Sequence, residues 1–588
     1  MKSAVFLEVM NNALKSIAEQ MSETMVRSSY SMIVKEMRDC SSSIFDSEGR
    51  LLAEGANIPI HLNCLGPVLN TILTSYYPKD TLKPGDVIIT NHPYAGGKSL
   101  GSHHTKDIVA VAPIFYKNKE LVGFAVTMLH HNDIGGAWGH DAWTIDIWQE
   151  GFLMEPLKLY DGGKINEVVL KIIQTNNRSP QKVRGDLMAQ ISGCNIGVKG
   201  FTQLIDKYGL NIIEKVTNDL LDYSERFTRA EIEKIPDGIY QHEEKLLDDG
   251  FKGGPYSLKL NITVKGSNIV FDYTGTDKQI KGPINSPLSA TLSATYYALK
   301  CLTNPLIPSN GGCQRPANII APEGTLVNCT IPIGCYERMV TDHVLVDLIM
   351  GAMSKAIPDK VMADSCGCLY NFASAINLET HPNGGEINHR QGWGEVVPGG
   401  LGARATKDGV SVMSCNVTNC ALPPIEAQEI EAPVLFIERS ILPDSAGPGK
   451  FRGGFSLQTK WKTFGYDTLF FYLSQKSKVP PQGLFGGGSG RCSEWIINEG
   501  RPKEEKLKYS MGDPIFLEYG DTVKFITPSG GGYGNPFDRD PKLIKKDVKK
   551  KLLSIKKARN DYGVVINPIT YQIDQEATNT LRKKLKSN

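Results

Sequence analysis

The chain has 588 residues, of which 41% are hydrophobic and 22% are charged, and its formal net charge is +2. This length exceeds what one hydrophobic core usually supports, and the composition is that of a folded globular protein, which excludes a disordered chain. A charge of +2 over this length creates no long-range field that would attract nucleic acid or an anionic membrane, so we expect small molecules and other proteins as partners.

The sequence contains no predicted membrane span or export signal. The best apolar candidate, 344–352, is interrupted by Asp347 and is too short to cross a bilayer. Near the N-terminus, Glu8 follows Lys2 too closely to leave the uncharged core of a signal peptide. We therefore expect a cytoplasmic protein, whose 12 cysteines are reduced and act as small buried apolar residues.

The N-terminal part of the chain predicts an α/β domain over 1–235. Apolar residues recur at three- and four-residue steps over 6–29, which predicts a helix with one buried face. Short β-rich runs separated by Gly, Pro and Asn follow over 40–129. Ser179-Pro180 then predicts the start of a long helical region that ends near residue 234.

Three further regions complete the predicted organisation. Alternating apolar residues over 256–264 and a helical pattern around 290–302 predict a mixed α+β domain over 236–385. Glycine and β-forming residues are abundant over 386–537, which predicts a β-rich domain, and a helical tail with a solvated lysine face follows over 538–588. The predicted class is therefore α+β, with several domains, mixed sheets, packed helices and a β-rich C-terminal domain.

Histidine is concentrated in one segment. Seven of the 11 histidines fall within it: His61, His92, His103, His104, His130, His131 and His140. The pattern His-x-x-Asp occurs twice there, as His104–Asp107 and His130–Asp133, each where a β-rich run meets a glycine-containing loop. Imidazole and carboxylate ligands together suit a divalent zinc, manganese or iron ion with a position left for water. The doubled pattern predicts a metal site, whereas the alternative for any single histidine is a structural residue hydrogen-bonded to a nearby aspartate.

Glycine-rich stretches elsewhere give weaker indications. The stretch 95–99 is similar to the end of a phosphate-binding P-loop, but His92 stands where the first glycine of that loop belongs. The stretch 97–101 matches the letters of a G-x-S-x-G nucleophile elbow, but loop-forming residues precede it where a buried strand is required. Runs at 486–490 and 530–534 predict tight turns. We therefore expect neither nucleotide binding nor a serine hydrolase.

Motifs along most of the chain match one known family. The motifs are Arg38-Asp39 with 44–50, Ile58-Pro-Ile-His61, Pro84-Gly-Asp-Val87, Asn91-His-Pro-Tyr94, Gly101-Ser-His-His104 with Asp107, 130–136, 149–151, 184–187, 449–454, 530–534 and 561–565. In these motifs the sequence resembles the hydantoinase B/oxoprolinase family. This family comprises the B subunits of ATP-dependent hydantoinases, 5-oxoprolinases and caprolactamases, and the related subunits of acetone and acetophenone carboxylases.

The resemblance implies a metal-carrying subunit in a hetero-oligomer. A separate hydantoinase A-like subunit would bind ATP and phosphorylate the amide oxygen of a cyclic substrate, or an enol oxygen in the carboxylases. The reaction would then be completed on this chain. Carried over position by position, the metal-ligand pattern of the family falls on Asp39, His104, Asp107 and His130. His131 and Asp133 adjoin that pattern and are the candidate catalytic residues, as proton shuttles.

Three functions stay open at this point. The first, which we expect, is an ATP-dependent hydrolase of a cyclic amide such as 5-oxoproline or a hydantoin. The second is a ketone carboxylase component, and the third is a scaffold that only holds the ATP-binding partner. Two departures from the family pattern leave the substrate and the metal open: His92 replaces a common aspartate, and the stretch Gly96–His104 is longer than usual.

Overall fold

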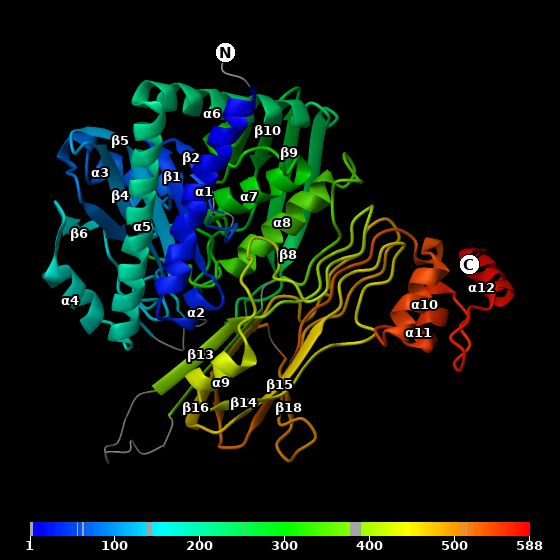
Figure 1. The fold of residues 1–588 in the computed structure, drawn as a ribbon. Helices are drawn as coiled ribbons and strands as arrows, with labels where there is room; N and C mark the ends of the chain where they lie inside the picture. Colours follow the sequence, from blue (N-terminus) through cyan, green and yellow to red (C-terminus); the bar gives the residue numbers. More distant parts are fainter. Residues whose placement is uncertain are drawn as a thin grey trace. The chain divides into compact units, whose positions relative to one another are not determined.

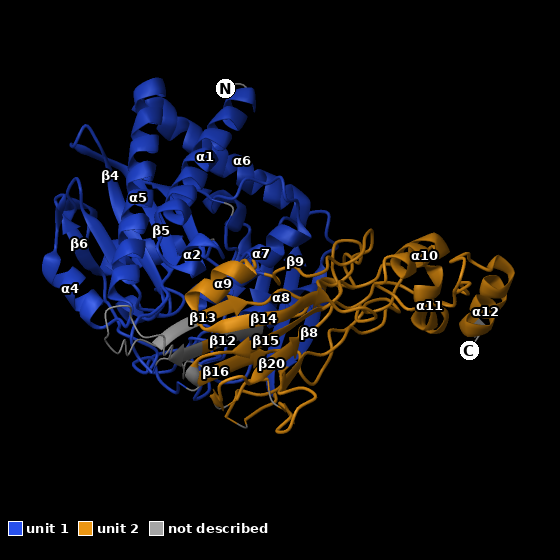
Figure 2. Ribbon diagram, turned by 60° about the horizontal axis from the view of Figure 1, so that its bottom comes forward, with its two compact units in different colours: residues 1–245, 256–352, 417–421 blue, residues 246–255, 353–416, 422–588 orange. Residues whose placement is uncertain are grey.

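The structure is a computed structural model that describes residues 4–55, 57–61, 64–137, 144–251, 253–367, 369–376, 390–508, 510–512 and 514–587 (Figure 1). The chain divides into two compact units (Figure 2). Unit 1 comprises Met1–Lys245, Tyr256–Ala352 and Val417–Ala421, and unit 2 comprises Leu246–Pro255, Met353–Asn416 and Leu422–Asn588. No helix among the described residues has the length and apolar character needed to span a membrane. The four-domain division predicted from the sequence stays a prediction.

Unit 1 is built on a seven-stranded sheet with the strand order β2-β1-β5-β4-β3-β6-β7. Its paired strands run antiparallel. The strands are β1 (Cys40–Asp46), β2 (Leu51–Glu54), β3 (Val87–Thr90), β4 (Asp107–Tyr116), β5 (Glu120–His130), β6 (Leu157–Asp161) and β7 (Lys164–Ile165). The central strands β1, β4 and β5 are almost wholly buried, and β4 and β5 are accordingly apolar on both faces for most of their length.

Helices cover both faces of this sheet (Figure 1). Ile44 of β1 packs with α1 (Ala4–Ser28), α5 (Pro180–Tyr208) and α6 (Leu210–Ile232). The next residue, Phe45, packs on the opposite face against α3 (Leu65–Ser75), as the two-residue period of a strand requires. The helix predicted over 6–29 and the helical region predicted from Ser179-Pro180 are both confirmed. Two short helices, α2 (Met32–Lys35) and α4 (Glu167–Thr175), contact α1 and α5 respectively.

Unit 1 also contains a four-stranded sheet with the order β11-β10-β9-β8. Its strands are β8 (Gly238–Leu246), β9 (Tyr256–Lys265), β10 (Asn268–Asp272) and β11 (Ala317–Ile320). The helices α7 (Leu288–Leu302) and α8 (Met339–Met353) lie beside it (Figure 1). Tyr273, directly after β10, bonds through its hydroxyl to Thr295 of α7, and Gly351 of α8 lies against His242 of β8. Arg338, the residue directly before α8, is buried.

Unit 2 is rich in β-strands, which together with the mixed architecture of unit 1 confirms the predicted α+β class. One sheet has the order β13-β12-β16-β19 and the other β14-β15-β20-β17-β18. The strands are β12 (Leu369–Ile376), β13 (Arg390–Val396), β14 (Val434–Ile441), β15 (Leu457–Thr463), β16 (Tyr466–Ser474), β17 (Glu494–Ile497), β18 (Glu505–Lys506), β19 (Ile515–Leu517) and β20 (Thr522–Ile526). Trp461 of one sheet contacts Trp393 and Phe470 of the other, so aromatic rings fill the space between the sheets.

Helices in unit 2 are short and peripheral to these sheets. They are α9 (Ile425–Glu431), α10 (Pro541–Lys549), α11 (Ile555–Tyr562) and α12 (Gln575–Ser587). The predicted helical tail therefore consists of three helices. The first begins at Pro541, where the Asp540 side chain accepts a hydrogen bond from the backbone N–H of Lys542.

Glycine-rich segments of unit 2 pack backbone against backbone outside the regular sheets. The N–H of Gly530 donates to the carbonyl of Gly454, and the N–H of Gly447 donates to the carbonyl of Gly530. A Cβ atom on Gly530 would lie 1.9 Å from the carbonyl oxygen of Leu401. Glycine is thus required for the close approach of neighbouring backbones. The prediction of a tight turn is wrong for 530–532, because these residues pair with neighbouring segments instead.

We expect the substitution Gly530→Ala to lower the free energy of unfolding of unit 2 by about 1–3 kcal/mol, because the added methyl group cannot be accommodated beside Leu401. Differential scanning calorimetry of the full chain measures the shift. The matched control is Gly66→Ala in α3, where the new Cβ would meet the Phe45 ring at an ordinary 3.6 Å. Equal melting temperatures for the two variants would contradict the packing argument.

Candidate metal centre

The register of two strands brings the first pair of candidate ligands together. Asp107 is the first residue of β4 and lies directly opposite His130, the last residue of β5. Directly opposed residues of an antiparallel pair carry their side chains on the same face of the sheet. His104 lies in the turn just before β4, where the N–H of Asp107 donates to its carbonyl at 3.1 Å. The strand pairing therefore joins parts of the two His-x-x-Asp motifs.

The donor atoms of these three residues are arranged as a ligand set. One carboxylate oxygen of Asp107, Oδ1, lies 3.1 Å from His104 Nε2 and 3.0 Å from His130 Nδ1. The two imidazole nitrogens are 3.1 Å apart. Donor atoms that share one ion at about 2.1 Å are roughly 3.0–3.5 Å from one another. The spacing and the chemistry of this donor set fit a divalent cation.

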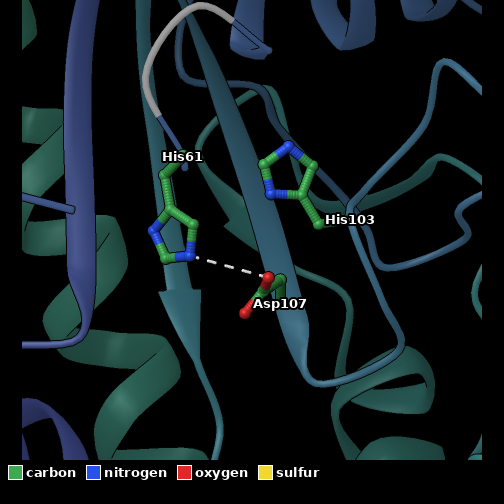
Figure 3. A group of neighbouring side chains, drawn as sticks. All are labelled: His61, His103 and Asp107. Atoms are coloured by element: carbon green, nitrogen blue, oxygen red, sulfur yellow. Dashed lines mark ion pairs between the residues drawn. The ribbon is translucent and has the colours of Figure 1, made fainter. Parts of the chain in front are cut away.

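A second group of donors surrounds the other oxygen of the same carboxylate (Figure 3). His61 Nε2 lies 3.6 Å from Asp107 Oδ2, and the ligand atoms of His61, His103 and Asp107 all lie within 4.8 Å of one another. His61 comes from a turn before α3, in which its N–H donates to the carbonyl of Ile58 at 3.0 Å. Histidine nitrogens therefore lie close to both carboxylate oxygens of Asp107.

Asp39 reaches the same end of the sheet from β1. The pairing of Cys40 with Leu129 places Asp39 beside His130, whose N–H donates to the Asp39 carbonyl at 3.2 Å. The Asp39 carboxylate oxygen Oδ1 lies 3.8 Å from His61 Nε2. All four predicted ligands therefore lie where β1, β4 and β5 meet. Their role as metal ligands stays a prediction.

The protonation states favour cation binding. Burial raises the pKa of a carboxyl, but interactions with His104, with His61 and with the Arg338 guanidinium outweigh this effect and hold the pKa of Asp107 well below its usual value. Burial lowers the pKa of both His104 and His103 well below the usual value. Asp107 is therefore an ionised carboxylate and His104 and His103 are neutral imidazoles, which are the forms that bind metal ions.

Arg338 is the nearest fixed positive charge. Its Nη2 donates to Asp107 Oδ2 at 2.9 Å, and both side chains are buried. Nothing in the sequence pattern predicts this contact, because the two residues are 231 positions apart. His61 and His103 lie in the histidine-rich segment and in two of the family motifs but were not among the predicted ligands, because the close approach of His61 to Asp107 depends on the fold.

The two candidate proton shuttles lie in different surroundings. Asp133 accepts from the Arg178 guanidinium at 2.9 Å and from the N–H of Gly135 at 3.1 Å. His131 is fully buried, and burial, partly opposed by the charge of Asp186 on α5, lowers its pKa to about 4. Neither residue belongs to a donor group around Asp107 within the described chain. Their role in proton transfer stays a prediction.

Of the two remaining histidines of the segment, His92 does not join these groups. His92 is buried beside Tyr94, with its Nε2 3.8 Å from a carboxylate oxygen of Glu155. His140 lies outside the described residues.

A comparison with protein families explains the shared motifs. The hydantoinase B/oxoprolinase family profile matches residues 3–536. The chain belongs to the hydantoinase B/oxoprolinase family. It is 31% identical to the B subunit of a putative D-/L-hydantoinase of Pseudomonas sp. (strain NS671), over 98% of each chain. The resemblance found in the sequence motifs is thereby confirmed.

Two solved structures are similar to this family member. The crystal structure of the ATP-dependent caprolactamase from Pseudomonas jessenii has a TM-score of 0.86 and 27% identity, and the match covers 99% of each chain. The nucleotide-free structure of acetone carboxylase has a TM-score of 0.88, covering 100% of this chain and 83% of the other. Its identity is 16%, so this second likeness shows the fold alone.

For this family member we expect Arg338→Met, studied in the presence of a chelator, to lower the free energy of unfolding by about 3–5 kcal/mol, because the buried Asp107 carboxylate loses its guanidinium partner. Thermal and urea unfolding followed by circular dichroism measure the loss. The matched control is Arg315→Met, whose ion pairs with Asp222 and Glu225 are partly exposed and worth about 0–1 kcal/mol. A loss no larger than that of the control would show that Arg338 does not hold the Asp107 charge.

Proposed function

We propose that this chain is the metal-carrying B subunit of an ATP-dependent hydrolase of cyclic amides, and that it works with a separate hydantoinase A-like subunit that binds ATP. The observation that carries the proposal is the donor set of buried His104, buried Asp107 and partly buried His130. Family membership and the relative named as one subunit of a hydantoinase support the reaction class and the need for a partner.

The chemistry of amides explains why two subunits would share the reaction. A stable amide resists attack by water, whereas phosphorylation of its oxygen makes the carbon electrophilic and provides a leaving group. We assign phosphorylation to the partner and hydrolysis to this chain. The name of the similar caprolactamase, which is ATP-dependent, supports the part of this proposal that requires ATP.

The residues of this chain would hold a zinc, manganese or iron ion through His104, Asp107, His130 and Asp39. When bound, such an ion lowers the pKa of water and polarises a carbonyl or phosphoryl oxygen. The chain itself fixes the geometry, because Arg338 anchors Asp107 and Asp107 lies between the two imidazoles. His131 and Asp133 are the candidates for moving a proton to or from the reacting atoms.

A polar cavity is lined by residues that adjoin Asp39 and His61 in the chain, and it would suit a small polar substrate. It has a volume of about 290 Å³ and is lined by residues that include Arg38, Asn57 and Asn419. Arg38 immediately precedes Asp39, and its φ of 60° lies in the left-handed region, so the chain turns sharply before the candidate ligand. We propose this cavity as the approach to the metal centre.

We expect the double variant His104→Ala/His130→Ala to lose its bound metal and to lower turnover of a cyclic amide by at least about 100-fold, because two of the proposed ligands are removed. The measurements are elemental analysis of the purified chain and ATP-dependent hydrolysis of 5-oxoproline or hydantoin with the partner subunit. The matched control is His242→Ala/His343→Ala, which removes two histidines of the same unit that lie outside both donor groups. Full metal content and full turnover in the His104/His130 variant would refute the proposal.

We expect the complex with its partner to couple ATP hydrolysis to the opening of a cyclic amide without consuming bicarbonate. Labelled bicarbonate, ATP and either cyclic amides or simple ketones distinguish this activity from that of a carboxylase. Transfer of label onto a ketone would replace the hydrolase proposal with the carboxylase alternative. A complex without metal and without either activity would leave only the scaffold function.

A further inference from the structure

We propose that His61, His103 and the Oδ2 oxygen of Asp107 form a second cation site, so that the Asp107 carboxylate bridges two divalent ions. This inference extends the proposed function, which needs only one ion on the Oδ1 side. The second site depends on the proposed function in one respect only, because both ions would share Asp107.

The first argument is the position of the carboxylate. Oδ1 is 3.1 Å from His104 Nε2 and 3.0 Å from His130 Nδ1. Oδ2 faces His61 Nε2 at 3.6 Å (Figure 3). A carboxylate with nitrogen donors at each oxygen has the arrangement that bridges two ions roughly 3.5–4 Å apart in two-metal sites.

The second argument is His103. Its side chain is fully buried, and neither ring nitrogen has a hydrogen-bond partner among the described residues. Buried polar atoms are nearly always paired, because burial without a partner is unfavourable. The ligand atom of His103 lies within 4.8 Å of those of His61 and Asp107. A cation held between these three residues would give an imidazole nitrogen of His103 the partner that it lacks.

The charges nearby predict that the second ion is held more weakly than the first. Asp39, which we also propose as a ligand of the first ion, favours the second as well, because its negatively charged Oδ1 lies 3.8 Å from His61 Nε2. Arg338 opposes it, because its guanidinium is 2.9 Å from the Oδ2 oxygen that the ion would share. We therefore expect two binding steps of different affinity.

A second cation would give this chain a way to hold a phosphorylated substrate. Paired ions stabilise both the attacking and the leaving oxygen in displacement reactions at phosphorus and carbon centres. Under the proposed function the leaving group is a phosphate, whose negative charge would offset the repulsion between the two ions and Arg338.

The test is the stoichiometry of Mn²⁺ binding to the full chain after treatment with a chelator. We expect the unmodified chain to bind two equivalents, one tightly and one more weakly, and to show the electron paramagnetic resonance signal of a coupled manganese pair. His103→Ala is expected to bind one equivalent and to show the signal of an isolated ion. The matched control His343→Ala, which removes an equally buried imidazole outside both donor groups, is expected to retain two.

Binding of one equivalent by the unmodified chain, lost in His104→Ala but kept in His103→Ala, would overturn the second site and leave the proposed function standing. Binding of no Mn²⁺ by the unmodified chain would overturn both. Circular dichroism establishes that each variant is folded, and His61→Ala provides a second variant of the same site should His103→Ala fail to fold. Two equivalents in folded His103→Ala and in folded His61→Ala would also overturn the second site.

Discussion

The buried negative charge of Asp107 is the constraint on which the centre of unit 1 depends. A carboxylate removed from water needs hydrogen bonds and opposite charge to stay ionised. Arg338 supplies the charge from the residue before α8, and His104, His130 and His61 surround the two oxygens. Because Asp107 begins β4 and Arg338 precedes α8, their ion pair also fixes the helical layer beside the smaller sheet to the seven-stranded sheet.

Features encoded by neighbouring residues could be predicted from the sequence. The three- and four-residue spacing of apolar residues predicted α1, and Ser179-Pro180 predicted the start of α5. The doubled His-x-x-Asp pattern predicted a metal site. Both motifs adjoin the β4–β5 hairpin at the end away from its connecting turn, where Asp107 pairs with His130. Asp39 came from the family resemblance alone, because only the pairing of β1 with β5 brings it to His130.

Features that depend on long-range packing could not be predicted. Asp133 occupies the same place in its motif as Asp107, but it is paired with Arg178, which lies just before α5. The contact between Arg338 and Asp107 spans 231 positions and leaves no periodic signal. The glycines near Gly530 suggested turns, yet their absent side chains allow backbones from distant segments to pack together. In each case the sequence identifies a residue type, and the partner is determined by the fold.

The central claim is that one divalent ion binds between His104, Asp107 and His130. Anomalous X-ray diffraction from crystals of the metal-loaded chain tests it most directly, because the signal locates the ion without reference to activity. The account predicts a peak roughly 2.0–2.3 Å from His104 Nε2, His130 Nδ1 and Asp107 Oδ1. A metal-loaded crystal with no peak among these three atoms, or with its peak at other residues, would contradict it.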